Sequence, residues 1–390
     1  MLKYIHLLLS KSFFKSFKIY NVLITKKETD VLYYLPQHFD SSTTYPFVIR
    51  HLINSNSNNK ISYYIFEEPN IFSSDKRNSK LIPADSFWLL ILILRKFYKG
   101  KNYFKIDLKI GAFLKYILLV KHDFKNIITV SQSMQSVLKG LFPNANHYDY
   151  QHGILSEKYF GYINKESTSK HLINNSIKVL LYGNSFKEKL LKLKGGEYFI
   201  KNAIVIGSPH LEYQQAKKSF NNSILFSLQF TSSHSNDTNI YYYNEIYQLF
   251  KDINDRNLEL TIYLKSHPRF DNCIDISSFY KFNFVKPAPT NIQECFDLCT
   301  LHITEYSTVV FDAIIYGIPT LLTKMFSSLN ILENEYHFPS KNLSLLDNIE
   351  KLKDPYFYSS TIVEQVEWSK KLYQVYDEKK YVKLMNEGNE

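Results

Sequence analysis

Short apolar runs alternate with longer stretches of helical periodicity along the first half of the chain. An apolar run at 61–66 predicts a strand, and an apolar face repeating at helical spacing predicts a helix at 86–98. The alternation continues with strands at 127–130, 147–150, 178–182 and 203–206 and helices at 131–138 and 185–193. Strands that alternate with helices in this way are typical of β-α-β units and a parallel sheet.

A second series of the same kind begins after Asn221-Asn222, which we interpret as a linker. It predicts strands at 224–230, 258–264, 282–286, 301–304 and 320–322, with helices at 241–254, 292–299 and 308–316. The chain of 390 residues is long enough for two such domains. We therefore predict an α/β protein of two doubly wound, Rossmann-like domains, 1–219 and 220–355, with helices in 356–390 that pack back across the domains.

Composition excludes several classes of protein. With 45% hydrophobic and 16% aromatic residues, the chain is not intrinsically disordered. The net charge of +10 is spread along the chain, so it reflects either a general bias in composition or an anionic partner such as a nucleotide or a lipid surface. No zinc-finger, helix-turn-helix or RNA-binding pattern occurs, and we predict no nucleic-acid partner.

The cysteines and the N-terminus bear on where the protein resides. Cys273, Cys295 and Cys299 are too few for a disulfide framework, so we expect buried reduced thiols, a cytoplasmic protein and no metal site. No apolar run reaches the ~20 residues of a membrane span. The first 24 residues interleave Lys with apolar residues. They predict an amphipathic helix leading into a strand at Asn21–Ile24, or alternatively a peripheral anchor at the inner face of the cytoplasmic membrane.

Ligands of doubly wound sheets bind at the carboxyl ends of the strands, so chemistry is expected in the strand-to-helix loops and in a cleft between the domains. Gln151-His152-Gly153 directly follows the strand at 147–150. The imidazole of His152 is suited to remove a proton from a hydroxyl near neutral pH, and Gly153 allows a substrate to approach the backbone. The alternative is an ordinary loop histidine.

Two further loops suggest phosphate binding. Lys265-Ser266-His267-Pro268 follows a strand and combines cations with a hydroxyl, and Pro268 stiffens the loop; a solvated basic turn is the alternative. Glu305, Ser307 and Thr308 follow the strand at 301–304. Ser307 is expected to cap a helix whose free N–H groups bind phosphate, and Glu305 to accept ribose hydroxyls or a base N–H. The alternative is one of the capped helices that any α/β protein contains.

Taken in order, these segments resemble a known family. Four segments are similar to the ordered motifs of the CDP-glycerol glycerophosphotransferases, which include teichoic acid polymerases. They are Gln151-His152-Gly153, Gly207-Ser208-Pro209, Lys265-Ser266-His267-Pro268 and the segment 304–313. Bacterial polysialyltransferases and capsule transferases share parts of the pattern. The resemblance covers roughly residues 125–325 and implies the GT-B architecture, in which two Rossmann-like domains face a central cleft.

The resemblance also implies an activity. It suggests transfer from a CMP- or CDP-linked donor to a hydroxyl of a glycan or lipid-linked glycan acceptor, without metal or cofactor, in the synthesis of a bacterial surface polysaccharide. His152 aligns with the family's proposed base and His267 with its donor-phosphate histidine. The resemblance assigns six further residues to the nucleotide site: Lys265, Ser266, Pro268, Glu305, Ser307 and Thr308. It places four in the lining of the cleft: Gln151, Gly153, Gly207 and Ser208.

The sequence departs from the family pattern in ways that affect the transferred group. Gln151 stands where an aromatic residue is usual, Ile154 where Thr is usual, and Glu305 where Asp is common. We therefore expect a sugar rather than glycerol phosphate to be transferred. A CDP-glycerol-dependent glycerophosphotransferase, a nucleotide-sugar epimerase and an inactive GT-B scaffold remain as alternatives.

Overall fold

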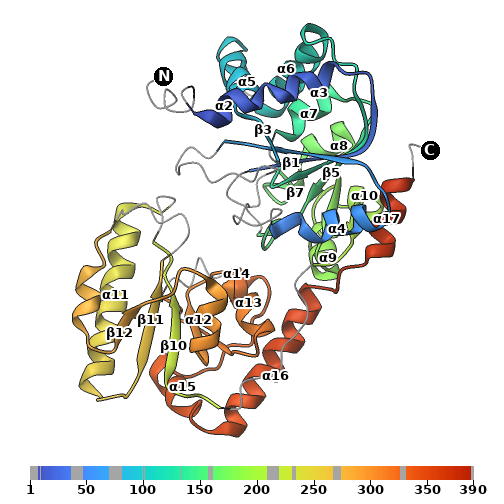
Figure 1. Ribbon diagram of the computed structural model, residues 1–390. Coiled ribbons are helices and arrows are strands. Elements are labelled where there is room, and N and C mark those ends of the chain that lie inside the picture. Colours follow the sequence, from blue (N-terminus) through green and yellow to red (C-terminus); the bar gives the residue numbers. More distant parts are fainter. Residues whose placement is uncertain are drawn as a thin grey trace. The chain divides into compact units, whose positions relative to one another are not determined.

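The computed structural model describes residues 8, 10–36, 47–69, 81–98, 100, 102–132, 134–156, 161–208, 219–230, 234–266, 274–325 and 331–387. The chain divides into two compact units (Figure 1). Unit 1 comprises Met1–Pro209 and Tyr373–Glu390, and unit 2 comprises His210–Leu372. The last two helices belong to different units: α16 (Pro355–Leu372) belongs to unit 2 and α17 (Glu378–Asn386) to unit 1.

Unit 1 is built on a seven-stranded parallel sheet of order β3-β2-β1-β4-β5-β8-β9. Its strands are β1 (Glu28–Leu35), β2 (Tyr63–Glu67), β3 (Ile82–Pro83), β4 (Asp123–Val130), β5 (Asn146–Tyr150), β8 (Lys178–Leu181) and β9 (Ala203–Val205). A separate antiparallel hairpin pairs β6 (Ile163–Asn164) with β7 (Ser167–Thr168). The chain starts in the middle of the large sheet and winds outward in both directions, which is the doubly wound topology predicted from the sequence.

Helices cover both faces of this sheet, since its strands are apolar on both sides. Leu32 and Tyr34 of β1 point into a core shared with the helices α3, α5, α6 and α7. Tyr33, between them, faces α4 and α17. The helices of unit 1 are α2 (Lys11–Ser16), α3 (Lys18–Ile24), α4 (Arg50–Asn58), α5 (Asp85–Phe97), α6 (Tyr103–Ile117), α7 (Gln135–Leu141), α8 (Lys170–Asn175), α9 (Asn184–Leu191), α10 (Tyr198–Asn202) and α17, with a 3-10 turn η3 (Phe47–Ile49).

The sequence-based prediction for the first part of unit 1 needs correction. The strand expected at Asn21–Ile24 is the last turn of α3, and the first strand is β1, a few residues later. Asp30, Tyr33 and Tyr34 concealed this strand, because they interrupt the aliphatic run that a buried strand usually shows. The hydroxyl of Tyr33 bonds to the side chains of Asn56 and Tyr381. Helices α4 and α6 were also missed.

Unit 2 holds a five-stranded parallel sheet of order β12-β11-β10-β13-β14. Its strands are β10 (Ser223–Ser227), β11 (Thr261–Lys265), β12 (Val285–Pro287), β13 (Leu301–Thr304) and β14 (Thr320–Leu322). Its helices are α11 (Asn236–Asp255), α12 (Ile292–Leu298), α13 (Val309–Ile315), α14 (Ile331–Asn334), α15 (Leu345–Lys351) and α16, with a 3-10 turn η4 (Ser277–Lys281). All five strands lie within or beside the segments predicted from the sequence.

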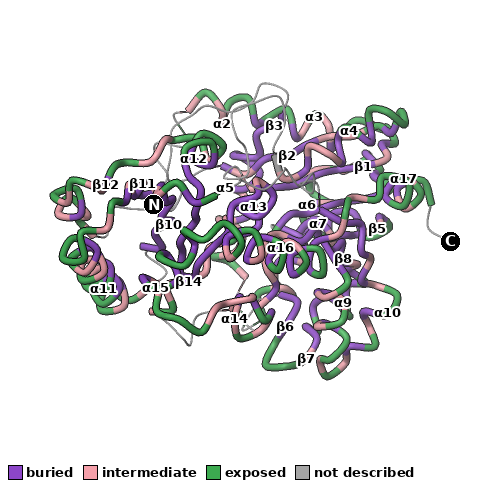
Figure 2. The backbone as a smooth tube through the Cα atoms, turned by 90° about the horizontal axis from the view of Figure 1, so that it is seen from below, coloured by how far each residue is buried: buried purple, intermediate pink, exposed green. Residues whose placement is uncertain are grey.

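Alternate residues of the central strand β10 face opposite layers of helices. Ile224 and Phe226 pack with α11, α15 and α16, whereas Leu225 packs with α12 and α13. Figure 2 shows the central strands of both sheets as largely buried and the outer faces of the helices as exposed. Cys295 and Cys299 are buried free thiols of this core, as predicted, and Cys273 lies outside the described residues.

Candidate functional site

The turn that follows β5 is held by the side chain of Gln151. Its Oε1 accepts a hydrogen bond from the backbone N–H of Tyr182 at 2.8 Å, and its Nε2 donates to the carbonyl of Gly153 at 2.7 Å. Gly153 has a φ of +67°, a left-handed conformation that glycine adopts without strain. The buried amide thus fixes the backbone on both sides of His152, whose imidazole is half-buried.

Directly before this turn lies Asp149, a buried carboxylate that the sequence analysis did not single out. It accepts hydrogen bonds from Thr129 Oγ1 at 2.7 Å, from Gln132 N at 2.8 Å and from Tyr162 Oη at 2.6 Å. These bonds stabilise the charged form, but burial dominates and raises the pKa of Asp149 to about 7. The residue therefore holds together the loops after β4 and β5.

A chain of hydrogen bonds leads from Thr129 to His171. Gln135 Nε2 donates to Thr129 Oγ1 at 3.0 Å, and His171 Nε2 lies 3.0 Å from Gln135 Oε1. Because an amide oxygen only accepts, His171 carries its proton on Nε2, and its Nδ1 accepts from Asn175 Nδ2 at 2.9 Å. Burial lowers the pKa of His171 to about 4, so the ring is neutral, and it stacks on Phe104 at 4.0 Å between ring centroids.

This network forms one wall of a pocket of about 220 Å³ beside the carboxyl ends of β2 and β4. Arg95 also lines this pocket; it binds Asp107 through two parallel hydrogen bonds of 2.8 and 2.7 Å and stacks on Tyr103. The pocket thus combines aromatic surfaces with amide, imidazole and guanidinium groups. Its lining residues come from four helices and two loops, which is why no local sequence pattern revealed it.

The structure places Gly207 and Ser208 against the C-terminal segment rather than in an open loop. A side chain at Gly207, where φ is +85°, would lie 2.2 Å from the carbonyl oxygen of Val375. Ser208 is buried, and its N–H donates to the carbonyl of Gln374 at 2.8 Å. The glycine is therefore explained by close packing of two backbones, without any ligand.

In unit 2, the loop between β13 and α13 carries Ser307 and Thr308. The helix begins one residue later than predicted: Thr308 is its N-cap and is exposed, and its side chain makes no capping bond. Ser307 Oγ instead accepts from the N–H of Val309 at 3.3 Å. Both hydroxyls lie at the carboxyl end of the central strands, where a doubly wound domain binds its ligand.

Glu305, one step earlier in this loop, is fully buried. Its Oε2 accepts hydrogen bonds from Thr323 Oγ1 and, at 3.0 Å, from the N–H of Met325. The carboxylate therefore ties the loop after β13 to the loop after β14. The contact with a ribose or base that we expected from the sequence stays a prediction.

The basic loop after β11 is described only as far as Ser266. The ammonium of Lys265 donates to the carbonyls of Pro289 at 2.6 Å and Thr290 at 2.5 Å, so it joins the loops after β11 and β12. Among the described residues, these two carbonyls account for two of its three N–H groups. Ser266 is half-buried, and His267 and Pro268 lie outside the described residues.

Two further residues at the carboxyl edge of the unit 2 sheet were not predicted. Tyr306 Oη hydrogen-bonds His234 Nε2, and His234 Nδ1 lies 3.3 Å from Asn239 Oδ1. This pair joins the loop after β13 to the loop after β10. The only signal of this pair in the sequence is a loop, 231–238, that is dense in Ser, Asn and His. Across the described parts of both units, no three His, Cys, Asp or Glu side chains are grouped to hold a metal ion.

Comparison with known proteins gives matches in structure alone. No family model matches the chain, and no curated protein matches its sequence. The structure of S. aureus MnaA with UDP matches with a TM-score of 0.55 and 10% identity, over 93% of this chain and 95% of that chain. The UDP-GlcNAc 2-epimerase from Methanocaldococcus jannaschii matches with a TM-score of 0.51 and 12% identity, over 92% and 99% of the two chains. The wall teichoic acid polymerase TagF matches with a TM-score of 0.49 and 13% identity, over 99% and 94%.

The first two of these likenesses extend over nearly the whole chain and include both units. Together with the two parallel doubly wound sheets, they confirm the fold expected from the sequence, a GT-B protein with two Rossmann-like domains and C-terminal helices.

Proposed function

We propose that the protein is a glycosyltransferase of bacterial surface-polysaccharide synthesis, which transfers a sugar from a cytidine-type nucleotide donor to a hydroxyl of a glycan acceptor. The observation that carries the proposal is the position of the family-like motifs. Two motifs lie at the carboxyl edges of the parallel sheets in this GT-B fold. Gln151-His152-Gly153 follows β5, and the segment 304–308 begins at the last residue of β13. Ligands of such sheets bind at that edge.

Unit 1 is assigned to the acceptor. His152 stands on a turn that Gln151 fixes on both sides, and a base must be held in place to remove a proton as the hydroxyl attacks. The pocket at the carboxyl ends of β2 and β4 supports a glycan as the acceptor, because sugar rings pack on aromatic faces and their hydroxyls bond to amide and guanidinium groups. Deprotonation by a placed base contributes about 10²–10⁴-fold to the rate.

Unit 2 is assigned to the nucleotide. Polar donors lie at the ends of two strands of this unit. They are the hydroxyls of Ser307 and Thr308 after β13, and the hydroxyl of Ser266 with the ammonium of Lys265 at the end of β11. His267, predicted from the sequence, would add a cation. These groups would hold the phosphate of the departing nucleotide and neutralise the charge that develops on it. The structure of S. aureus MnaA, matched with a TM-score of 0.55, is consistent with this assignment, since it is named as a UDP complex.

Nucleotide binding provides the test. We expect CMP or CDP to raise the melting temperature more than UDP, GDP or ADP, because ligand at 100 times its Kd adds about 2.7 kcal/mol to stability. Assays with CMP- and CDP-linked sugars should then show release of nucleotide that depends on an added glycan. Equal or greater stabilisation by UDP would refute the cytidine assignment, and release of nucleotide from CDP-glycerol alone among the donors would favour glycerophosphate transfer.

An epimerase is the second candidate, because one of the matched structures is a UDP-GlcNAc 2-epimerase. That reaction needs no acceptor. Conversion of a sugar nucleotide to its epimer in the absence of any glycan would therefore replace the proposed transfer reaction. One observation argues against an epimerase. Asp149 and Glu305, the carboxylates described above at the strand ends, are buried and bonded to the protein's own donors.

We further propose that unit 1 contacts an anionic membrane, where a lipid-linked acceptor would lie. Ile24, Tyr116, Ile117 and Leu119 are 48–81% exposed at the ends of α3 and α6, and the N–H groups of Lys121 and His122 join these ends by bonding to the carbonyl of Leu23. Lys26, Lys115 and Lys121 line a surface hollow beside them. We call these seven residues the α3–α6 patch, namely Ile24, Lys26, Lys115, Tyr116, Ile117, Leu119 and Lys121.

Apolar side chains among lysines favour peripheral binding to an anionic surface. No described helix is both long and apolar enough to cross a bilayer.

A further inference from the structure

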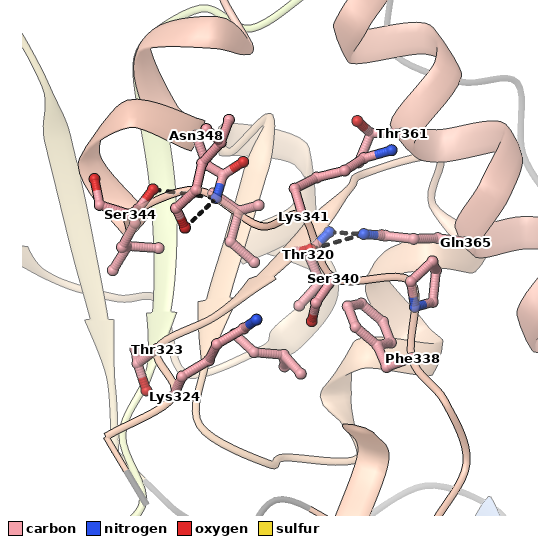
Figure 3. Close-up of a pocket in the computed structure, with 15 residues that line it drawn as sticks. Thr320, Thr323, Lys324, Phe338, Ser340, Lys341, Ser344, Asn348, Thr361 and Gln365 are labelled. Carbon is pink, nitrogen blue, oxygen red and sulfur yellow. Dashed lines mark hydrogen bonds between the residues drawn. The ribbon is translucent and has the colours of Figure 1, made fainter. Parts of the chain in front are cut away.

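A second pocket lies in unit 2, on the outer side of the edge strand β14. It has a volume of about 200 Å³. Its walls are β14 itself, the segment 338–344 and the helices α15 and α16 (Figure 3). None of the residues that we assign to the nucleotide lines it, although Thr323, which bonds Glu305, does.

The walls of this pocket are firmly held. Gln365 of α16 accepts from the N–H of Thr320 at 2.8 Å and donates to its carbonyl at 2.7 Å, as a neighbouring strand would. Trp368 Nε1 donates to the carbonyl of Tyr336 at 2.7 Å, and its ring packs edge-on against Phe338. The pocket is therefore part of the folded unit and does not require a rearrangement to form.

Two polar atoms of the lining lack a partner. Asn348 is 5% exposed; its Nδ2 donates to the carbonyls of Leu343 and Ser344, both at 3.1 Å, but its Oδ1 is buried without a hydrogen bond among the described residues. The same holds for Ser340 Oγ. A buried acceptor left unsatisfied costs about 1–3 kcal/mol. Because Asn348 Oδ1 is buried, a ligand that donates to it gains this energy only when the side chain of Asn348 turns toward the pocket.

The charged groups of the pocket are already paired. Lys324 lies 2.7 Å from Glu333, and Lys341 lies 2.5 Å from Glu364. Each ammonium still has further N–H donors, but the site presents no uncompensated charge. Figure 3 shows the side chains of Lys324 and Ser340 extending into the pocket from different walls. A neutral ligand that both donates and accepts hydrogen bonds matches this arrangement.

We propose that this pocket binds one neutral sugar ring. Hydroxyl groups accept from Lys324 and, once Asn348 turns toward the pocket, donate to its Oδ1, while the C–H faces of the ring contact Leu321, Phe338 and Leu343. A cavity of about 150 Å³ accommodates benzene, so this volume suits a single ring. The site is separate from the proposed reaction, and its occupancy does not depend on that reaction.

Saturation-transfer NMR on the full chain tests this site. The probes are glucose, galactose and N-acetylglucosamine, with glucuronate and cytidine as the charged and the aromatic comparison. We expect transfer to at least one neutral sugar with an affinity in the millimolar range, weakened at least fivefold by Ser340→Val and by Leu343→Trp, which fill the pocket. Ser360→Val is the matched control, because Ser360 lies on α16 but does not line the pocket.

The outcomes separate the alternatives. Neutral sugars that bind with equal affinity to the wild type and both filled variants occupy another site and overturn the proposal. Binding of cytidine or glucuronate that the filled variants weaken, without sugar binding, assigns the pocket to another ligand. Absence of transfer to any probe means that the pocket holds water only. Thermal melts of each variant verify that the fold is retained, and loss of binding in one folded variant suffices as support.

Discussion

The amide of Gln151 accepts a hydrogen bond from the backbone N–H of Tyr182 at 2.8 Å, and so the turn carrying His152 is tied to the end of the neighbouring strand β8. The strand order makes this bond possible, because β5 and β8 are adjacent and parallel.

Replacing Gln151 by Ala tests whether this bond places the base. The change leaves the N–H of Tyr182 and the carbonyl of Gly153 without their partner, and the buried N–H of Tyr182 alone then costs about 1–3 kcal/mol. We expect a lower free energy of unfolding in urea and a lower kcat, with nucleotide affinity unchanged. The control is Asn202→Ala, which removes a comparable side-chain bond in α10, to the carbonyl of Tyr198. Equal loss of turnover in both variants would refute a local role for Gln151.

The two predicted histidines should differ in their effects. We expect His152→Ala to lower turnover by at least ~10²-fold while nucleotide affinity stays nearly constant, because a base contacts the acceptor and not the donor. His267→Ala should also weaken nucleotide binding by about 1.5–3 kcal/mol, the value of a charge-assisted hydrogen bond. Calorimetric affinity and initial rate, measured for each variant, distinguish the two roles. The reverse pattern would exchange the assignments.

The buried carboxylate of Asp149 predicts a pH dependence of stability. Its pKa is raised to about 7, whereas the unfolded chain has the ordinary value of 3.8. Between these values the native state retains a proton that the unfolded state releases, so this residue's contribution to stability falls as pH rises from about 4 to about 7 and is constant above. The total change is at most about 4 kcal/mol.

Asp149→Asn removes this contribution. The free energy of unfolding of the variant, relative to the wild type, should therefore rise between pH 4 and 7 and level off above pH 7. Burial lowers the pKa of His147 and His302 to about 3 and that of His171 to about 4, which destabilises both proteins below pH 6.5. Their effect cancels in the comparison. A difference that does not change with pH would show that Asp149 is ionised throughout.

The α3–α6 patch predicts salt-sensitive binding to anionic vesicles. Each lysine near the surface contributes about 1 kcal/mol, and this attraction is screened by salt. We expect co-sedimentation at low salt, reduced by Ile117→Glu because the change places a negative charge on the apolar part of the patch. Ile200→Glu is the control, since Ile200 is 62% exposed on α10, outside the patch. If both variants sediment like the wild type, the patch is not the contact.

The sequence by itself determined the α/β class, the two series of strands and helices, and the positions of the loops after β5, β11 and β13. Buried parallel strands are continuous apolar runs, and helices that cover them have one apolar face, so both leave a local signal. Where buried residues are polar or aromatic, as with Tyr33 and Tyr34 of β1, that signal is weak, and the first strand was missed.

Tertiary structure alone decided what the polar residues bind. Glu305 bonds Thr323, 18 residues away, and Lys265 bonds the carbonyl of Thr290, 25 residues away. Gly207 is required by the backbone of Val375, far along the chain. A sequence pattern shows that a carboxylate, an ammonium or a glycine follows a strand. Whether that group faces a ligand or the protein's own backbone depends on which strands become neighbours, and strand order is set by packing of the whole domain.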